Sequence, residues 1–228
     1  SELGPTNGLV AYYPLNGDAK DYANANDGTV NGATISAGIN GKACYSFDGV
    51  NDYITIDGAS SHIAGNDFTL SAWINGPSQD HKGVVPINTS SGGNRALWLI
   101  RTNGMGIYDG ATWYIGSSNV GDSSWHHVLI TYRVGEKEAK LYADGVLDSA
   151  FTTGNTINVT SDDKISIGQE WDSATPSDFF NGLIQNVRIY NRALSPEEIT
   201  ILYDLERGDT IKAKMDKNTL YIGGQIHE

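Results

Sequence analysis

The fold is decided by residues 180–196, Phe180-Asn181-Gly182-Leu183-Ile184-Gln185-Asn186-Val187-Arg188-Ile189-Tyr190-Asn191-Arg192-Ala193-Leu194-Ser195-Pro196, where an apolar strand pattern leads into a helix start. Ser195 can cap this helix, Pro196 fits its first turn, and Glu198 completes a capping box. Beyond them, three apolar residues share one helical face: Ile199, Leu202 and Tyr203. We therefore expect a strand followed by one short C-terminal helix that lies against a sheet.

Short apolar–polar runs separated by turn signals recur along the chain up to about residue 191. Asp-Gly pairs, which tolerate the positive φ angles of tight turns, predict hairpins around Asp144-Gly145 and Asp109-Gly110. The longest hydrophobic runs, residues 68–74 and 125–132, are expected to be central strands. This pattern predicts an all-β chain that forms a two-sheet antiparallel β-sandwich.

The charge and composition of the chain indicate which classes of partner it is unsuited to bind. The 228 residues carry a net charge of −12, which argues against nucleic acid and against anionic lipid. No run approaches the ~20 apolar residues of a membrane span, so we expect no membrane insertion. The single Cys44 excludes an intrachain disulfide and is expected to be a small buried hydrophobe. The composition changes after Gly208, so we expect one domain over residues 1–205 and a tail over 206–228, either an added strand or the start of another domain.

Acidic residues cluster in the stretch Ile167-Gly168-Gln169-Glu170-Trp171-Asp172-Ser173, and a further carboxylate follows at Asp178. Oxygen ligands on a loop held by a strand suit a hard cation such as Ca²⁺, the cofactor that we expect. The alternative is a solvated acidic loop that binds nothing. A second candidate for a structural cation is the loop Asp18–Gly28, with Asp21, Asn24, Asn26 and Asp27, although these side chains could simply hydrogen-bond their own loop.

Aromatic side chains in or beside turns could stack on a sugar ring. The candidates are Trp98, Tyr108, Trp113, Tyr114 and Trp171. Trp73 and Trp125 lie within apolar runs and are expected in the core. His126 and His127 point to opposite faces of one strand, so they cannot share a metal.

Several motifs, in this order, resemble one family: residues 8–17 (GLVAYYPLNG), 46–54 (SFDGVNDYI), 68–74 (FTLSAWI), 125–128 (WHHV), 141–145 (LYADG) and 187–203. Together they resemble the laminin-G-like jelly-roll domains of the concanavalin A-like lectin/glucanase superfamily. The resemblance covers roughly residues 8–204 and implies a jelly roll of two packed antiparallel sheets.

The stretch from Ile167 to Ser173 is also similar to the calcium loop of the pentraxins, members of the same superfamily. By position, that resemblance implies metal ligands at Asn94, Glu170, the Trp171 carbonyl, Asp172 and Asp178. Gly93 stands where an aspartate is expected, so one carboxylate is missing. Relatives also hold a structural cation beside the residue 18–28 loop with an acid from the last strand, where this chain has Gln185 and Asn186.

Hydrolysis is not expected. The family's hydrolases carry Glu-x-Asp-x-x-Glu on one strand, and here Glu170-Trp171-Asp172 is followed by Thr175 at the position of the last acid. The sequence therefore predicts a non-catalytic, calcium-supported carbohydrate-binding or adhesion module, extracellular or on a cell or virion surface, whose partner is a glycan or surface glycoconjugate. The alternative is a structural or protein-interaction module of a larger surface assembly (a pilus, surface protein or phage-tail appendage) that contacts other subunits and binds no sugar.

Overall fold

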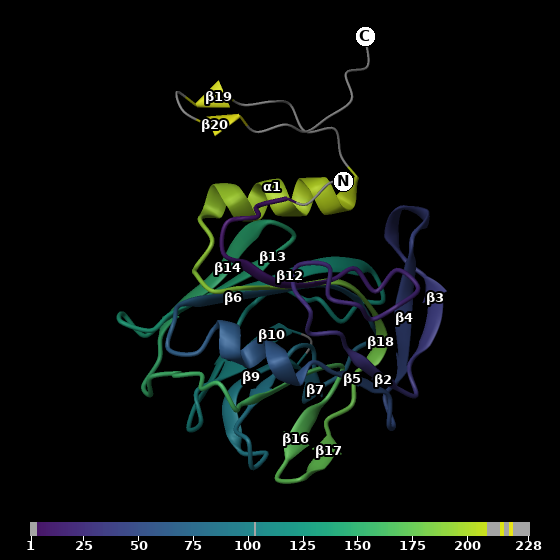
Figure 1. Cartoon of the computed structure of the whole chain (residues 1–228), viewed down its shortest axis with the longest axis horizontal. Helices are drawn as coiled ribbons and strands as arrows, with labels where there is room; N and C mark the ends of the chain where they lie inside the picture. Colours follow the sequence, from purple (N-terminus) through teal and green to yellow (C-terminus); the bar gives the residue numbers. More distant parts are fainter. Residues whose placement is uncertain (1–3, 103, 209–214, 217–218, 221–228) are drawn as a thin grey trace.

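Two antiparallel sheets pack face to face, and one helix lies on the outer side of the first sheet (Figure 1). The computed structural model describes residues 4–102, 104–208, 215–216 and 219–220. The predicted all-β jelly-roll sandwich with one C-terminal helix is confirmed.

The first sheet has the order β14-β13-β12-β6-β18-β4-β3, and β1 pairs with β18. Its two predicted central strands lie side by side, since His127 of β12 is in register with Trp73 of β6. The strand bounds are β1 Leu9–Tyr13, β3 Thr34–Ala37, β4 Ala43–Asp48, β6 Phe68–Asn75, β12 Trp125–Arg133, β13 Glu138–Ala143, β14 Val146–Thr152 and β18 Asn181–Tyr190.

The second sheet has the order β11-β10-β9-β8-β15-β5-β2, and β7 pairs with β9. Its strands are β2 Thr29–Asn31, β5 Tyr53–Thr55, β7 Lys82–Gly83, β8 Ile87–Asn88, β9 Asn94–Arg101, β10 Gly104–Tyr108, β11 Trp113–Ile115 and β15 Lys164–Ile167. A separate hairpin, β16 Glu170–Asp172 with β17 Thr175–Ser177, lies at the end of the molecule away from the helix (Figure 1). Two 3₁₀ segments, η1 Ile39–Gly41 and η2 Asp57–His62, complete the sandwich.

The core lies between the sheets because side chains alternate along each strand. In β6, Phe68, Leu70 and Ala72 enter the core that also holds Trp98 and Ile100 of β9. The alternate residues of the first sheet point outward, where a second apolar cluster packs under the helix, made of Leu129, Tyr142, Tyr190, Leu194, Ile199 and Leu202. Helix and sheet thus bury both faces of the central strands, which explains their nearly continuous apolar sequence.

Helix α1 spans Pro196–Arg207 and begins with the predicted capping box. The Ser195 hydroxyl accepts the Glu198 N–H at 3.3 Å, and the Glu198 carboxylate accepts the Ser195 N–H at 2.9 Å. The helix continues two residues past the predicted boundary at residue 205, and Glu206 is buried. In the predicted tail, β19 (Met215–Asp216) pairs with β20 (Thr219–Leu220), and the other residues after Gly208 lie outside the described part of the chain.

The predicted Asp-Gly hairpins are confirmed. The β13–β14 turn places Asp144 at φ 50° and Gly145 at φ 77°, the left-handed conformation that favours such pairs in tight hairpins. The β10–β11 turn is closed by the Asp109 carboxylate, which accepts the N–H groups of Ala111 and Thr112. These turns fix which residues reach each end of the sandwich.

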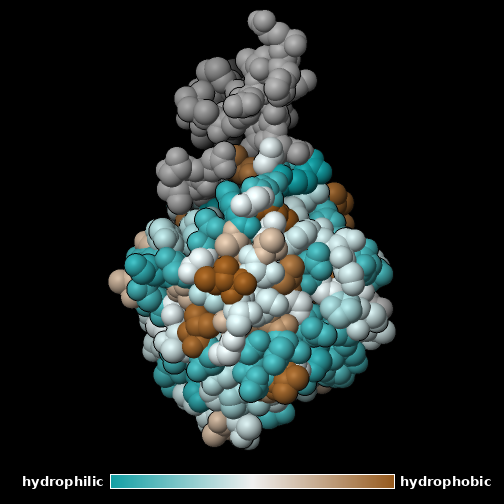
Figure 2. Space-filling model, turned by 90° about the vertical axis from the view of Figure 1, so that its right-hand side faces the viewer, coloured by the Kyte–Doolittle hydropathy of each residue, from teal (hydrophilic) through white to brown (hydrophobic). Residues whose placement is uncertain are grey.

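The side of the molecule formed by β2 and the β3–β4 hairpin is mostly hydrophilic. Figure 2 shows separate hydrophobic spots there rather than one continuous patch. The exposed large apolar residues include Val30, Ile35 and Val50, and scattered residues of this kind are normal for a protein surface. Among the described residues, α1 is too short and too polar to cross a membrane.

Candidate functional site

The outer face of the second sheet carries an aromatic cluster that we define as Tyr108, Trp113, Arg101 and His81. Trp98 and Ile100 of β9 point into the core, so the alternating Arg101 lies on the opposite face. Met105 and Ile107 of β10 also point into the core, so Tyr108, the next residue, lies on the outer face of the sheet. Tyr108 is in register with Trp113 of β11, so both rings lie on this outer face.

The four side chains contact one another closely. The Tyr108 and Trp113 rings are 5.0 Å apart, the Arg101 Cζ atom lies 4.5 Å from the Trp113 ring centroid, and His81 meets the indole edge-on at 6.0 Å. Gly106 permits this arrangement, because a Cβ there would lie 2.6 Å from Arg101 Cγ. The indole is only partly exposed and is in contact with a cation and a phenol.

Asp80 supplies a carboxylate at the edge of the aromatic cluster. Its oxygens lie 2.9 Å from His81 Nδ1 and 3.6 Å from Arg101 Nε. Burial raises the pKa of Asp80, but the Thr102 N–H and the Arg101 guanidinium outweigh that effect and hold the pKa below its usual value. Arg101 Nε and Nη1 have no hydrogen-bond partner among the described residues. The cluster therefore offers an aromatic surface beside an ionised carboxylate and a guanidinium.

A second group of rings lies on the same face, toward β5. Trp171 meets Tyr53 edge-on with ring centroids 6.2 Å apart, and Lys164 Nζ lies 4.5 Å from the Trp171 centroid. Ile54 and Ile165, the neighbours of Tyr53 and Lys164, are in the core. The hairpin β16–β17 thus places Trp171 at the rim of the outer face.

The predicted calcium ligands Glu170 and Trp171 are brought together by a residue that was not expected at this site. The Asn88 side chain donates through Nδ2 to Glu170 Oε2 at 3.0 Å and to the Trp171 carbonyl at 3.1 Å, and its Oδ1 accepts the Trp171 N–H at 3.2 Å. Glu170 Oε1 accepts from the Ser177 hydroxyl at 3.0 Å. The amide nitrogen of Asn88 therefore lies between the two oxygens expected to bind the ion.

Asp172 and Asp178 lie near enough to Glu170 to act on its charge. Burial raises the pKa of Glu170, and the two neighbouring carboxylates raise it further. Asn94 lies across from Asn88 in the β8–β9 pairing, with an exposed side chain. In residues 4–102 and 104–208, no group of three or more His, Cys, Asp or Glu side chains is arranged to hold a metal. The Asn88 amide thus contacts two of the oxygens expected to bind Ca²⁺, and calcium binding at these residues stays a prediction.

The loop near Asp21 also satisfies its own carboxylates. Asp21 Oδ1 accepts the N–H groups of Tyr12 and Ala23 at 2.9 Å, and Oδ2 accepts the Asn26 N–H at 3.3 Å. Asp27 Oδ1 accepts the Asp21 N–H at 2.9 Å. These bonds match the alternative in which the residues hydrogen-bond their own loop.

The structure separates the predicted sugar-stacking residues. The prediction for Trp98 is wrong, because its side chain is 0% exposed in the core. Tyr114 packs against Phe151, and its hydroxyl bonds Asp109 and the Gly154 N–H, so its ring is engaged inside the fold. Tyr108, Trp113 and Trp171 remain partly exposed on one face. Trp125, expected in the core, is also partly exposed.

Sequence reasoning missed Asn88, Arg101 and His81. Asn88 acts on residues 82 and 83 positions away in the chain, so no local pattern could reveal it. Arg101 could have been found from strand alternation, because it continues the outward series of β9 directly before a turn.

The comparisons with known proteins agree with this fold. A family model described as the concanavalin A-like lectin/glucanases superfamily matches residues 48–200. The chain is 23% identical over 202 residues to the rat protein named sushi, von Willebrand factor type A, EGF and pentraxin domain-containing protein 1. That match covers 78% of this chain and 6% of the rat protein, so the chain spans a small part of that relative's length.

Two solved structures have similar folds. Domain 4 of an extracellular arabinanase from Geobacillus stearothermophilus, in complex with arabinotriose, aligns with a TM-score of 0.67 and 22% identity, covering 86% of this chain and 97% of that domain. The binding domain of Paraclostridial Mosquitocidal Protein 1 aligns with a TM-score of 0.70 and 20% identity, covering 90% of this chain and 53% of that one. At this level of identity the likeness concerns the fold.

Proposed function

From the chain's membership of the concanavalin A-like lectin/glucanases superfamily, we propose that it is a non-catalytic carbohydrate-binding module whose glycan lies on the outer face of the second sheet. The observation that carries this proposal is the Trp113 indole, which is partly exposed and lies beside Tyr108 and Arg101. An aromatic face can pack against the C–H side of a sugar ring, while a few fixed polar groups bind its hydroxyls.

The polar groups beside Trp113 suit a sugar's hydroxyls. Arg101 supplies N–H donors and Asp80 supplies acceptor oxygens within the same cluster. Trp171 and Lys164, toward β5, would give a longer glycan a further point of contact. The arabinotriose bound to the similarly folded arabinanase domain supports an oligosaccharide as the ligand.

We further propose that the chain does not hydrolyse its glycan, for a reason that lies in its own residues. A glycosidase needs two carboxyl groups flanking the scissile bond. Glu170 is held by Asn88 and Ser177, and the position three residues after Asp172 is Thr175, in the strand that pairs with β16. We further propose an extracellular or surface location, supported by the extracellular arabinanase among the proteins of similar fold.

Calcium support stays a prediction. Its basis is the group Glu170, Asp172 and Asp178, where burial raises the pKa of Glu170 and the charges of Asp172 and Asp178 add to this effect. Against it, the amide of Asn88 donates to two of the expected ligands. If the ion binds, Glu170, Asp172, Asp178 and the Trp171 carbonyl would hold it, and it would supply positive charge for sugar hydroxyls at the rim beside Trp171.

The test is a glycan array followed by calorimetry on each glycan that binds. We expect Trp113→Ala to weaken binding by about 2 kcal/mol, which is about 30-fold in Kd. The matched control is Tyr22→Ala, because Tyr22 is also exposed (60%) but lies on the loop beside β1. If the wild-type chain binds no glycan on the array, the alternative of a protein-interaction module is favoured. If Trp113→Ala and Tyr22→Ala weaken glycan binding equally, the glycan does not bind on the outer face of the second sheet.

A further inference from the structure

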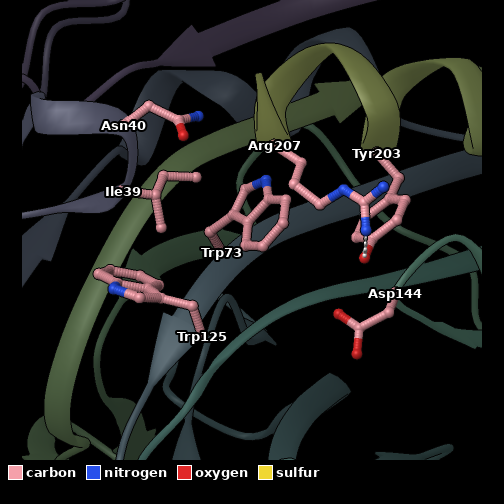
Figure 3. Close-up of a pocket in the computed structure, with 7 residues that line it drawn as sticks. All are labelled: Ile39, Asn40, Trp73, Trp125, Asp144, Tyr203 and Arg207. Atoms are coloured by element: carbon pink, nitrogen blue, oxygen red, sulfur yellow. Dashed lines mark hydrogen bonds between the residues drawn. The ribbon is translucent and has the colours of Figure 1, made fainter. Parts of the chain in front are cut away.

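A pocket lies on the other side of the sandwich from the aromatic cluster, on the outer face of the first sheet. It has a volume of about 220 Å³ and lies between the 3₁₀ segment η1 and the last turn of α1. Three aromatic side chains line it, Trp73, Trp125 and Tyr203, together with three polar ones, Asn40, Asp144 and Arg207. Figure 3 shows Trp73 at the centre of this group, with Trp125 on one side and Asp144 on the other.

The aromatic wall of this pocket is rigid before any ligand arrives. The Trp73 ring stacks on Tyr203 with centroids 5.6 Å apart and an interplanar angle of 14°. Its Nε1–H donates to the buried Glu206 carboxylate at 2.8 Å. Because the ring is fixed by stacking and by a hydrogen bond, a ligand would not have to immobilise it.

Trp125 is a partly exposed aromatic of the pocket, as is Tyr203, whereas Trp73 is buried. Trp125 begins β12, directly across the ladder from Asn75, and its side chain is only partly buried. A tryptophan at a strand end, beside a hollow, is free to offer its face to a ligand. The sequence places it in an apolar run, which is why it was expected in the core.

Fixed acceptors lie at the polar edge of the pocket. Asp144 accepts the His127 N–H at 2.9 Å and lies 2.8 Å from His126 Nδ1. Burial raises the pKa of Asp144, but these two hydrogen bonds outweigh it and hold the pKa below its ordinary value. An ionised carboxylate has about four acceptor positions, so Asp144 keeps capacity for ligand hydroxyls. Asn40 donates its Nδ2 to the Glu206 carbonyl at 2.7 Å, which leaves its Oδ1 as a further acceptor.

Charge and size narrow the ligand class. Asp144 and Arg207 bring opposite charges to the same pocket, and the Arg207 guanidinium already lies 4.9 Å from the Tyr203 centroid. A second cation would be repelled there, so an aromatic cage for an ammonium group fits less well. Pockets for drug-sized ligands measure about 300–1,000 Å³, so this smaller hollow suits a single ring.

We propose that this pocket is a second carbohydrate-binding site, which takes one neutral pyranose ring with its C–H face on Trp125 and its hydroxyls on Asp144 and Asn40. It shares its ligand class with the proposed function but none of its residues. The two sites would make the chain a bivalent module that engages a glycan on both sides of the sandwich.

The two sites can be tested separately by following the indole Nε1–H signals of the full chain in ¹H–¹⁵N NMR spectra, each assigned by a Trp→Phe variant. The probes are methyl glycosides of glucose, galactose, mannose and N-acetylglucosamine, with tetramethylammonium as the cationic probe. We expect at least one methyl glycoside to shift the Trp125 signal, and Trp125→Ala and Asp144→Asn each to weaken that binding at least tenfold.

Each other outcome overturns the second site. If no methyl glycoside shifts the Trp125 signal, or if only tetramethylammonium does, the pocket does not take a sugar. A sugar that shifts Trp113 alone would support the proposed function and contradict this inference. If Trp125→Ala fails to fold, Asp144→Asn and the signal shifts in the wild-type chain still decide the result.

Discussion

The Arg188 guanidinium and the Glu206 carboxylate form a buried ion pair, with Nε and Oε1 2.7 Å apart. Arg188 lies in β18 and Glu206 in the last turn of α1, so the pair joins the helix to the centre of the first sheet. The other Glu206 oxygen accepts a hydrogen bond from Trp73, which lines the pocket on the outer face of the first sheet. One carboxylate thus fixes both the helix and the pocket.

Glu206→Gln should destabilise the chain strongly. It leaves the Arg188 charge buried without its counter-charge, and breaking a buried pair in this way costs about 3–5 kcal/mol. Urea unfolding of the two proteins at neutral pH measures the difference. The control is Glu197→Gln, an exposed acid in the first turn of the same helix, expected to change the free energy of unfolding by less than about 1 kcal/mol. Equal effects of the two substitutions would contradict a special role for the pair.

His126 should make stability fall as the pH rises. The hydrogen bond to Asp144 raises the pKa of His126 above 6.5, and Asp122 adds to this effect from the other ring nitrogen. The folded state therefore binds the proton more tightly than the unfolded state. The stabilisation is complete below the unfolded pKa and is lost as the pH rises through the higher folded pKa.

The test measures urea unfolding midpoints of the wild-type chain and of His126→Gln at pH values from below the unfolded pKa of His126 to above its folded pKa. The difference in urea midpoint between the two proteins should become smaller as the pH rises. A difference that stays constant would show that protonation of His126 does not stabilise the fold.

His127, the next residue, should have the opposite effect. It is fully buried between Trp73 and Tyr203, and desolvation lowers its pKa to about 3. Its Nε2 lies 3.7 Å from Glu206, too far for a hydrogen bond, so the neutral ring is the folded form. The contribution of neutral His127 to stability is present above the unfolded pKa of 6.5 and is lost as the pH falls toward 3.

The variant His127→Phe keeps a ring in this place and removes the titration. Overpacking could lower its stability at every pH, so the informative quantity is the slope of the unfolding free energy against pH. We expect a shallower loss toward acid in His127→Phe than in the wild-type chain. The same slope in both proteins would mean that other groups cause the acid sensitivity.

The fold could be predicted from local sequence because its main devices are local. The Ser195–Glu198 capping box and the Asp144-Gly145 turn each involve residues close in the chain, and both form as expected. Apolar alternation then assigns most residues to the correct face. The burial of the acid Glu206 could not be predicted from the sequence, because it depends on Arg188 and Trp73, which lie in distant strands.

The sites could not be predicted so well because they depend on contacts between distant segments. Trp98 and Trp113 look alike in sequence, yet strand register sends one into the core and the other to the surface. The pocket on the first sheet forms only where five segments meet: η1, β6, β12, the β13–β14 turn and α1. No spacing in the chain encodes that meeting.

Asn88 is the residue that tests the calcium prediction most directly. Its amide nitrogen donates to both Glu170 Oε2 and the Trp171 carbonyl, so it satisfies the oxygens that a cation would need. Asn88→Asp replaces this donor with an acceptor beside Glu170. Without a cation the variant should be less stable, because two buried carboxylates then repel each other. Added Ca²⁺ should neutralise them and raise the melting temperature of the variant.

Melting temperatures of the wild-type chain and of Asn88→Asp, each with EDTA and with Ca²⁺, separate the possibilities. If Ca²⁺ raises the melting temperature of both proteins, the result supports a calcium site in the natural chain, with Asn88 displaced by the ion. A rise in Asn88→Asp alone would mean that the amide of Asn88 takes the place of the ion, and the wild-type module would then bind its glycan without calcium. If neither protein responds, Glu170, Asp172 and Asp178 form no cation site even after the donor is removed, because the geometry of the β16–β17 hairpin does not bring enough oxygens together.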